Sequence, residues 1–585
     1  MQEAVDLLRS CGIELRDGQR PQLHTSTALF RYKLSTALRS TPAATQQVSE
    51  LVDELLAAHD DITLYLDPVS LAEPQADGGF GQQAESLVRL LLGVDALQPE
   101  LIRALLDKFS EFVGDQPAED TQDDMGGAGE TKVSVKILRQ LRWLDYVVDP
   151  AALSEKLLET LGFVTLDMQR EIIGNLANIV SDGDNAEVAR VLAGMLNESG
   201  ELMLPILEAL GSLGCPAGVL QEARNAVLAH VVSAEPMDLP VMVRFLLQSV
   251  AGDQAAATIQ RLRRRLDLDS LMLTRPGHAS RAGGAQKESA AALLLFDVLA
   301  TTLRGNRTLG DAWLRIISDA GAETANTGST MTLDLIVLLI LHPTAAYTRR
   351  VERVLRSRIN TVVVSGSSDS SDVLAFTPQV VGEAIGRLAE VFAANFGALM
   401  AVASGLVRSS ARGSQEARVA GAMVVAAFGH MGMFQRQEIA GELAAHIGSG
   451  NADEVDTAAR IFLELARKYP WELRPFAVFI KGLLDYVDNL KVEHVRVVFS
   501  ALGILATLNT LGSADDGLFS DLHIYVRKQL SSTHARYNRI GIIGTVALLR
   551  QLGGAPSAQT EGREAGEEAD SQAGTSTSAH GQPAN

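Results

Sequence analysis

Apolar side chains recur along most of the chain with the spacing of an amphipathic helix. Residues 97–109 are a clear example, with apolar positions three and four residues apart: Leu101, Ile102, Leu105, Leu106 and Phe109. Residues at this spacing share one face of a helix. Caps mark where such helices begin, as at Asp149-Pro150 and Thr377-Pro378, because Asp and Thr side chains accept from free amides and proline fits the first turn.

The helical units follow one another at intervals of about 15 to 25 residues, as in helical repeat proteins. Few segments alternate as half-buried strands do, and no strict period is visible. The pattern therefore predicts an all-α fold, an irregular α-solenoid of HEAT-like helical repeats with a disordered acidic loop and a disordered C-terminal tail.

Segments rich in Gly, Ser, Asp and Pro interrupt the helical pattern and contain little to bury. The expected division is an N-terminal helical solenoid at 1–113, an acidic disordered loop at 114–132, a helical solenoid at 133–272, a flexible loop at 273–290, a helical segment at 291–363, a Ser-rich loop at 364–372, a helical domain at 373–553 and a disordered tail at 554–585.

Length and composition support several helical units rather than one core. The chain has 585 residues, of which 46% are hydrophobic and 5% aromatic, and a single compact core rarely grows to this size. The apolar share is mostly Ala, Leu and Val, a mixture that favours helix over strand. Wholesale disorder is excluded.

Neither disulfides, metal sites nor membrane spans are expected. Cys11 and Cys215 are too few for a disulfide framework or a four-ligand zinc site, which predicts a reducing, intracellular compartment and no cofactor. The first residues are acidic, unlike a secretory signal. The uncharged stretches 419–435 and 335–341 fall short of the roughly 20 apolar residues of a membrane span and are interpreted as buried helices.

Motifs for catalysis are weak. Gly79-Phe80-Gly81 lacks a preceding strand, and Gly448-Ser449-Gly450 lacks the lysine of a phosphate-binding loop. Asp120, Asp123 and Asp124 lie in a segment without a rigid scaffold for acid/base chemistry. We therefore expect that the chain is not an enzyme.

Basic clusters are more informative. The candidate phosphate or DNA contacts are Arg261, Arg263, Arg264 and Arg265; Arg349, Arg353 and Arg356; and Arg527 with Lys528. Residues 522–550 hold five basic residues and no acidic one. Solvated arginines on ordinary helices are the alternative interpretation of any single cluster.

The acidic net charge of −20 does not argue against phosphate binding, because it is concentrated. Residues 50–77, 114–132 and 554–585 carry −8, −5 and −4, so these 79 residues hold −17 and the other 506 hold only −3. The helical body is therefore close to neutral, and its basic clusters are not screened by a uniformly acidic surface.

Residues 523–546, HIYVRKQLSSTHARYNRIGIIGTV, closely resemble the Fanconi anaemia group D2 family around its ubiquitin-acceptor lysine. The resemblance covers nearly the whole chain up to the tail, in the same order. The other segments that carry it are LLRSCGIEL at Leu7, LVRLLLGVDALQPELI at Leu87, LRQLRWLDYVVD at Leu138, MDLPVMVRFLLQSV at Met237, LLLFDVL at Leu293, VERVLRSRI at Val351, IGSGNADEVDTA at Ile447 and FAVFIKGLLDYVDNL at Phe476.

This resemblance implies a nuclear scaffold without catalytic activity that acts in DNA interstrand crosslink repair. It implies a heterodimer with the Fanconi anaemia group I protein on double-stranded or branched DNA, and ubiquitin attached by the Fanconi core-complex ligase. The competing hypothesis is a helical-repeat protein-binding adaptor or transport factor with no DNA role.

The acceptor position departs from the family. Where the family has Lys-Tyr-Lys, this chain has Arg536-Tyr537-Asn538, followed by Arg539, Ile540 and Gly541. Isopeptide formation needs an amine that attacks a thioester, which an Asn amide and an Arg guanidinium cannot supply. Lys528 is the nearest alternative, and ten residues along one helix would place it roughly 15 Å away. Conventional ubiquitination at Asn538 is therefore not expected.

Two further expectations concern length and phosphorylation. The resemblance stops soon after this segment, without the family's long carboxyl-terminal solenoid, which suggests either a truncated product or gene model, or a short paralogue. Ser/Thr-Gln dipeptides, which checkpoint kinases recognise, occur at Thr45, Thr121, Ser414 and Ser571. Chance is the alternative, because such dipeptides are common.

Overall fold

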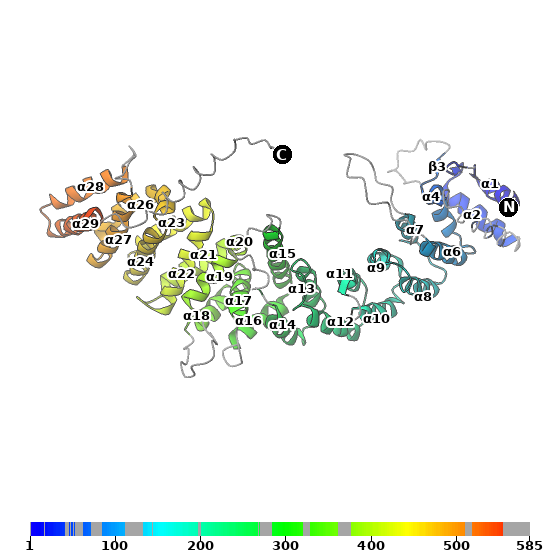
Figure 1. The fold of residues 1–585 in the computed structure, drawn as a ribbon, viewed down its shortest axis with the longest axis horizontal. Coiled ribbons are helices and arrows are strands. Elements are labelled where there is room, and N and C mark those ends of the chain that lie inside the picture. Colours follow the sequence, from blue (N-terminus) through cyan, green and yellow to red (C-terminus); the bar gives the residue numbers. More distant parts are fainter. Residues whose placement is uncertain are drawn as a thin grey trace, which may run out of the picture. The chain divides into compact units, whose positions relative to one another are not determined.

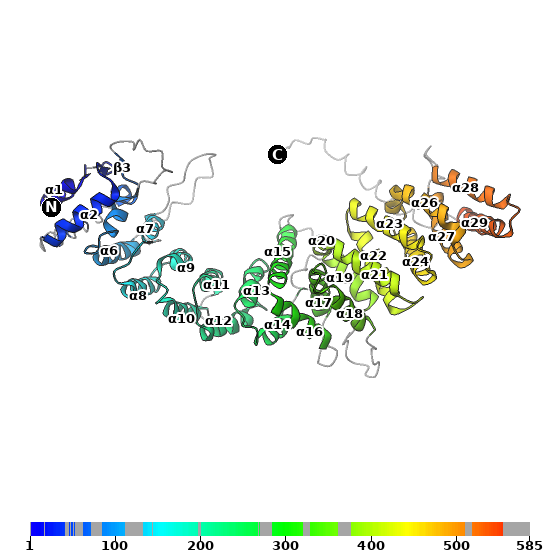
Figure 2. The same cartoon turned by 180° about the vertical axis from the view of Figure 1, so that it is seen from behind.

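The computed structural model describes two compact units, Met1–Arg265 and Leu266–Asn585, each considered by itself. The described residues are 2–16, 18–40, 62–71, 85–111, 133–142, 144–196, 200–266, 284–319, 328–360, 376–508 and 517–553, with residues 46, 48, 50, 52 and 268. Figures 1 and 2 show both units from opposite sides. The segments 114–132, 364–372 and 554–585, expected as loops and tail, lie outside these residues.

The described residues of unit 1 form helices and one small sheet. Its helices are α1 Gln2–Cys11, α2 Thr27–Ser40, α4 Ile62–Leu66, α5 Leu87–Leu92, α6 Gln98–Glu111, α7 Val133–Leu141, α8 Pro150–Leu161, α9 Leu166–Ile179, α10 Asn185–Met195, η2 Gly200–Leu202, α11 Met203–Ser212, α12 Ala217–His230, α13 Leu239–Gln248 and α14 Ala255–Arg265. From α6 onward the helices form two rows, because α6, α8, α10, α12 and α14 contact in turn, as do α7, α9, α11 and α13.

The sheet was not predicted. Strand β2 (Gln22–Leu23) pairs antiparallel with β1 (Ile13–Glu14) and parallel with β3 (Ser70–Leu71). Each strand has two residues, too few for an alternating pattern to stand out in the sequence.

The helices of unit 2, taken by itself, also form two rows. Its helices are α15 Gly284–Gly305, α16 Arg307–Asp319, α17 Gly328–Leu341, α18 Thr348–Ile359, α19 Pro378–Arg387, α20 Ala389–Ala394, α21 Phe396–Ser409, α22 Gln415–His430, α23 Met433–Ile447, α24 Ala452–Lys468, α25 Pro470–Leu473, η4 Arg474–Phe476, α26 Ala477–Tyr486, η5 Val487–Asn489, α27 Val492–Thr507, α28 Gly517–Leu530 and α29 Ala535–Gly553. One row runs α15, α17, α19, α22, α24, α27 and α29, each helix contacting the next. Helices α21, α23, α26 and α28 form part of the other row (Figure 1).

The stacking of these helices confirms the predicted all-α solenoid, and local signals place its elements well. Asp149 and Thr377 cap α8 and α19, accepting from the amides of Ala152 at 3.1 Å and Val380 at 3.3 Å. The predicted stripe of α6 is buried throughout. These caps and stripes act within one or two turns, which is why the sequence alone reveals them.

Two boundaries differ from expectation. Helix α15 begins at Gly284, so the end of the segment 273–290 is helical rather than loop. The uncharged stretch 419–435 is not one helix, because α22 ends at His430 and α23 begins at Met433. Residues 335–341 do form a buried helix, as predicted, within α17. Among the helices of the described ranges, none combines the length and apolar character needed to cross a membrane.

Candidate functional site

Helices α28 and α29 form an antiparallel hairpin that contains the acceptor-like segment. A Cβ atom on Gly541 would lie 2.7 Å from the Leu530 amide nitrogen, and one on Gly544 would lie 2.7 Å from Val526 Cγ2. Real Cβ atoms do not approach other atoms so closely, so only glycine allows the two helices to pack at this distance. The Ile-Gly-Ile-Ile-Gly pattern is thus explained by packing.

Asn538 closes the end of this hairpin. Its side-chain amide Nδ2 donates to the carbonyl oxygen of Leu530, the last residue of α28, at 2.9 Å. The last carbonyls of a helix have no partner within the helix, so this bond satisfies one of them. Asn538 therefore has a capping role, and its amide is no nucleophile.

Lys528 lies closer to Asn538 than the sequence indicated. The estimate of roughly 15 Å assumed one continuous helix and is wrong, because α28 ends at Leu530 and α29 begins at Ala535. The chain turns back, and Asn538 bonds Leu530, two residues from Lys528. Lys528 is exposed. Distance along the chain is therefore no objection to Lys528.

The residues beside Asn538 mostly stabilise the hairpin. The Arg536 guanidinium donates to the carbonyl oxygen of Asp488, and the Tyr525 hydroxyl donates to the Asp488 carboxylate at 3.2 Å. Burial, followed by the charge of Asp488, raises the pKa of Tyr525 well above its usual range. Arg536 and Tyr525 thus attach η5 to both helices of the hairpin.

Three other residues of the segment have distinct surroundings. The Tyr537 ring lies 5.2 Å from the His534 ring, between centroids. Ile540 is buried and Arg539 is exposed. Both line a cleft of about 180 Å³, together with the buried Leu490 and Val495. This cleft has an apolar floor and a cationic rim.

The arginines of α14 are largely engaged in packing. Arg263 is 5% exposed. Arg265 Nη1 donates to the Leu228 carbonyl oxygen at 2.5 Å, and Arg261 Nη1 donates to Asn225 Oδ1 at 3.1 Å. Both partners lie on α12, so these bonds hold α14 against its neighbour in the row. Arg261, Arg264 and Arg265 are all exposed, and the bonds above tie Arg261 and Arg265 to α12.

The candidate arginines of α18 differ in how far they are exposed. Arg349 and Arg353 are exposed, opposite the buried Val351 and Leu355. Arg356 is half-buried and lines a small cleft with residues of α21. Two of the three candidates on α18 therefore face solvent.

The three basic clusters do not meet within one unit. Helix α14 belongs to unit 1, whereas α18 and α28 belong to unit 2. Helix α18 packs on α16, α17 and α22, whereas α28 packs on α26, α27 and α29. Figures 1 and 2 show α18 and α28 at separate positions along unit 2.

A buried carboxylate network connects successive repeats of unit 2. The Asp456 side chain, 3% exposed on α24, lies 2.7 Å from Arg460 Nε and 3.3 Å from Arg412 Nε. Arg412 also bonds Glu493 of α27 at 2.7 Å. No local sequence signal marks this network, because Arg412 and Glu493 are 81 residues apart. A pattern search over single helices misses it.

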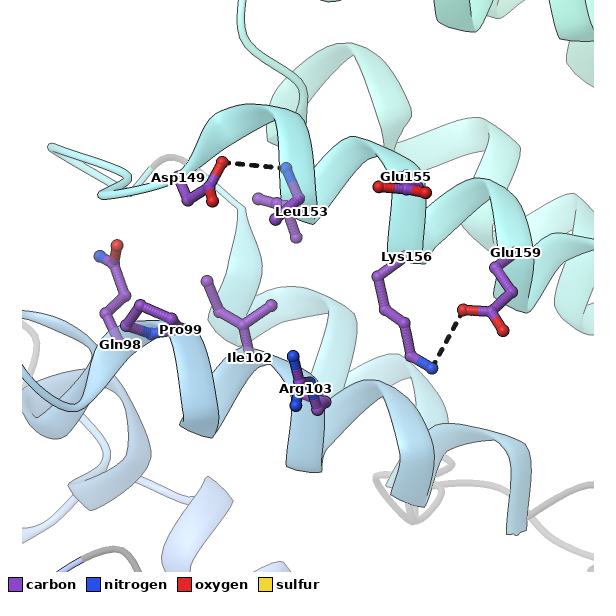
Figure 3. A pocket seen from close by; sticks show the side chains of 10 residues that line it. Gln98, Pro99, Ile102, Arg103, Asp149, Leu153, Glu155, Lys156 and Glu159 are labelled. Carbon is purple, nitrogen blue, oxygen red and sulfur yellow. Dashed lines mark hydrogen bonds and ion pairs between the residues drawn. The ribbon is translucent and has the colours of Figure 1, made fainter. Parts of the chain in front are cut away.

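A pocket of about 420 Å³ lies between α6 and α8 in unit 1, and several of its polar side chains are bonded within the fold. Lys156 Nζ lies 3.2 Å from Glu159 Oε2 (Figure 3). It also lies 3.0 Å from Asp107 Oδ1. Asp149 caps α8, and Gln98 bonds the backbone at Leu92, Tyr146 and Val148. These polar groups stabilise the fold locally.

Other sequence candidates are constrained or undescribed. The Ser414 hydroxyl caps α22 by accepting from the Ala417 amide at 3.2 Å. Thr45, Thr121 and Ser571 lie outside the described residues, as do Gly79-Phe80-Gly81 and the aspartates of 114–132. In the part of the chain that the structure describes, no group of three or more His, Cys, Asp or Glu side chains could hold a metal ion.

Comparison with known proteins agrees with the sequence segments. The model of a family described as "Fanconi anaemia protein FancD2 nuclease" matches residues 2–578. The Fanconi anemia group D2 protein homolog of Rattus norvegicus is 30% identical over 563 residues, and that of Mus musculus is 29% identical over 563. The Fanconi anemia group D2 protein of Gallus gallus is 29% identical over 565 residues. These alignments cover 93% of this chain and 37% of each relative, so the chain spans little more than a third of their length.

Proposed function

Because this chain belongs to the FancD2 family of Fanconi anaemia proteins, we propose that it acts as a non-enzymatic nuclear scaffold in the repair of DNA interstrand crosslinks. The match of the family model over residues 2–578 carries this proposal. Family membership confirms the resemblance seen in the sequence and supports a role in the Fanconi anaemia pathway. Partners and activities are proposed only for the part of the relatives that this chain spans.

Double-stranded or branched DNA is the proposed ligand of the exposed basic groups. These are Arg349 and Arg353 on α18 and Arg527 and Lys528 on α28, with Arg264 in unit 1. Cationic side chains that neutralise phosphates release counterions, which makes such binding steeply dependent on salt. The buried Arg263 and the packed Arg265 are not part of this surface, because their side chains hold α14 in place.

Salt-dependent binding to duplex DNA tests this function. The purified chain, alone and with a group I partner, is titrated with a fluorescent duplex at several salt concentrations. We expect affinity at low salt that falls steeply as salt is added. If neither sample binds duplex or branched DNA at low salt, the scaffold does not act on DNA, and the alternative of a protein-binding adaptor or transport factor is favoured.

The group I protein is the proposed partner, and ubiquitin control is proposed to differ from the family pattern. Position 538 lacks an amine, and its side chain is bonded to the end of α28. Lys528, exposed on the same hairpin, is the amine adjacent to that position. We infer that the core-complex ligase does not modify residue 538 and that any conjugate on this hairpin forms at Lys528.

Reconstituted ubiquitination distinguishes the two positions. Asn538→Lys should give a single strong conjugate, because it restores an amine at the acceptor position. The unaltered chain should give little conjugate, and Lys528→Arg should remove that remainder while keeping the positive charge. A conjugate on the unaltered chain that is as strong as that of Asn538→Lys and survives Lys528→Arg would contradict the inference.

The family description contains the word nuclease, so the absence of catalysis also needs a direct test. The chain should leave labelled duplex and branched DNA intact in the presence of Mg²⁺ or Mn²⁺. Metal-dependent cleavage by the purified chain, lost on mutation of its own carboxylates, would overturn the non-enzymatic part of the proposal.

A further inference from the structure

Arg412 joins three successive repeats of unit 2. It lies in the turn 410–414 between α21 and α22, where Gly413 has a φ of +70°, a left-handed conformation that glycine adopts without strain. The guanidinium Nε lies 3.3 Å from Asp456 Oδ2 on α24, and Nη1 donates to Glu493 Oε2 on α27 at 2.7 Å. Because α22 packs against α24 and α24 against α27, one side chain connects the first repeat to the third.

The two arms of this bridge differ in exposure. The Asp456 carboxylate is 3% exposed and also accepts from Arg460 Nε at 2.7 Å, so two arginines hold it. Glu493 is 66% exposed, and Arg412 itself is 49% exposed. Salt screens a pair of exposed charges, whereas partly buried pairs are screened much less. The bond from Arg412 to Glu493 should therefore open first as salt is added.

Glu493 is close in the chain to Asp488, which holds the α28–α29 hairpin. The Arg536 guanidinium donates to the Asp488 carbonyl oxygen, and the Tyr525 hydroxyl donates to the Asp488 carboxylate at 3.2 Å. Asp488 belongs to η5, and Glu493 belongs to the first turn of α27. Residues 488–493 are thus attached on one side to the turn before α22 and on the other side to the hairpin.

Apolar packing is incomplete at this end of α27 and α29. A cleft of about 180 Å³ lies between Leu490 and Val495 at the start of α27 and Ile540 in α29. A gap of this kind removes close contacts that would otherwise hold the two helices together. The polar bonds of Asp488 and Glu493 therefore carry more of the attachment here than they would in a closely packed interface.

We propose that Arg412 is a salt-sensitive latch for the α28–α29 hairpin. At low salt its bond to Glu493 holds the start of α27, and Asp488 transmits this restraint to the hairpin. As salt screens the bond, Asp456 keeps the arginine in place while the start of α27 and the hairpin loosen together. The latch thus sets the mobility of the segment that contains Lys528.

Hydrogen exchange of the complete chain, followed by mass spectrometry at about 0.05 M and about 0.5 M potassium chloride, tests this latch. Residues 495–498 carry the first helical amides of α27, beginning with the bond from Val495 to the Lys491 carbonyl oxygen. We expect these amides, and those of residues 538–541 in α29, to exchange about fivefold faster at high salt. Residues 458–465 of α24 are the internal reference, because the buried arm should stay closed.

Variants of the chain complete the test. Glu493→Gln removes only the exposed arm, so both sets of amides should already exchange about fivefold faster at low salt and change little as salt is added. Tyr525→Phe removes one bond between the hairpin and Asp488, so it should loosen the hairpin but not the start of α27. Glu464→Gln, at an exposed carboxylate of α24, is the matched control and should leave the exchange and its salt dependence unchanged.

Three results would overturn the proposal. One is that residues 495–498 exchange equally fast at both salt concentrations, relative to α24. Another is that Glu493→Gln exchanges as the unaltered chain does. The third is that Glu493→Gln loosens the start of α27 and leaves the hairpin unchanged, because Asp488 would then transmit no restraint. Neither DNA nor ubiquitin enters these measurements, so failure here is distinguishable from failure of the proposed function.

Discussion

Helices α14 and α18 carry four and five arginines, and each buries one of them, Arg263 at 5% exposed and Arg358 at 2%. The two helices differ in how the arginines named as candidate phosphate contacts are placed. On α14, Arg263 is buried and Arg265 bonds the Leu228 carbonyl oxygen of α12. On α18, Arg349 and Arg353 are exposed on the face opposite the core. The number of arginines in a helix therefore does not measure how much cationic surface it offers. What the guanidinium groups contact decides this.

The spacing of the arginines explains the difference. Those of α14 occupy offsets of zero, two, three and four residues from Arg261, which distributes them around most of a helical turn. At least one must then point toward the neighbouring helices. The candidates of α18 are separated by four and three residues, so they share one face. Spacing is visible in the sequence and is the better guide to exposure.

Removing the buried arginine of α14 should produce the largest effect. Arg263→Ala removes a long side chain whose stem and head are both enclosed, so we expect unit 1 to lose about 2 kcal/mol of unfolding free energy. Urea denaturation measures this. Arg264→Ala is the matched control on the adjacent, exposed position, with an expected change within about 0.5 kcal/mol. Equal losses of unfolding free energy in Arg263→Ala and Arg264→Ala would show that Arg263 contributes no more to packing than Arg264 does.

The complementary change on α18 should affect DNA rather than stability. Replacing both Arg349 and Arg353 by alanine removes two candidate phosphate contacts, so the slope of log affinity against log salt should fall by about 2. Arg387→Ala is the control, since this arginine is exposed in unit 2 but paired with Glu383 at 3.6 Å. An unchanged slope in the double variant would remove α18 from the DNA surface. A loss of stability would show that these arginines also serve packing.

The sequence predicted the structural features that depend on neighbouring residues, and it missed the contacts that depend on residues far apart in the chain. The caps at Asp149 and Thr377 and the stripe of α6 were correct because they act within a few residues. The position of Lys528 relative to Asn538 was misjudged because four residues after Leu530 reverse the chain. A turn this short changes every later distance while leaving the helical pattern on both sides intact.

The candidate site shows the same division. The exposed face of α18 follows from spacing on a single helix, whereas the bond from Arg265 to α12 joins residues 37 positions apart. The Asp456 network likewise joins the turn before α22 to α24 and α27. Contacts between repeats depend on how the helices stack, and the chain shows no strict period from which that stacking could be read.

His494 is a buried basic residue whose charge depends on pH, so it can be compared with the packed and exposed arginines. His494 on α27 is 4% exposed, and burial lowers its pKa, an effect that the nearby Asp456 opposes. The imidazole Nε2 lies 4.0 Å from Asp456 Oδ1, with Arg412 also near that carboxylate. In the folded chain His494 therefore takes up a proton at lower pH than in the unfolded chain.

The sign of the pH effect follows from this difference. As pH falls below the unfolded value of about 6.5, the unfolded chain binds the proton first, so the free energy of unfolding decreases. We expect unit 2 to be less stable at pH 5 than at pH 7, and His494→Gln to reduce that difference because glutamine does not titrate. Urea denaturation of both proteins at the two pH values provides the measurement, and the pH-dependent change rather than the absolute stability is compared. If the stability of the two proteins changed equally with pH, the burial of His494 would not lower its pKa relative to the unfolded chain. The contrast between packed and exposed basic groups would then not include His494.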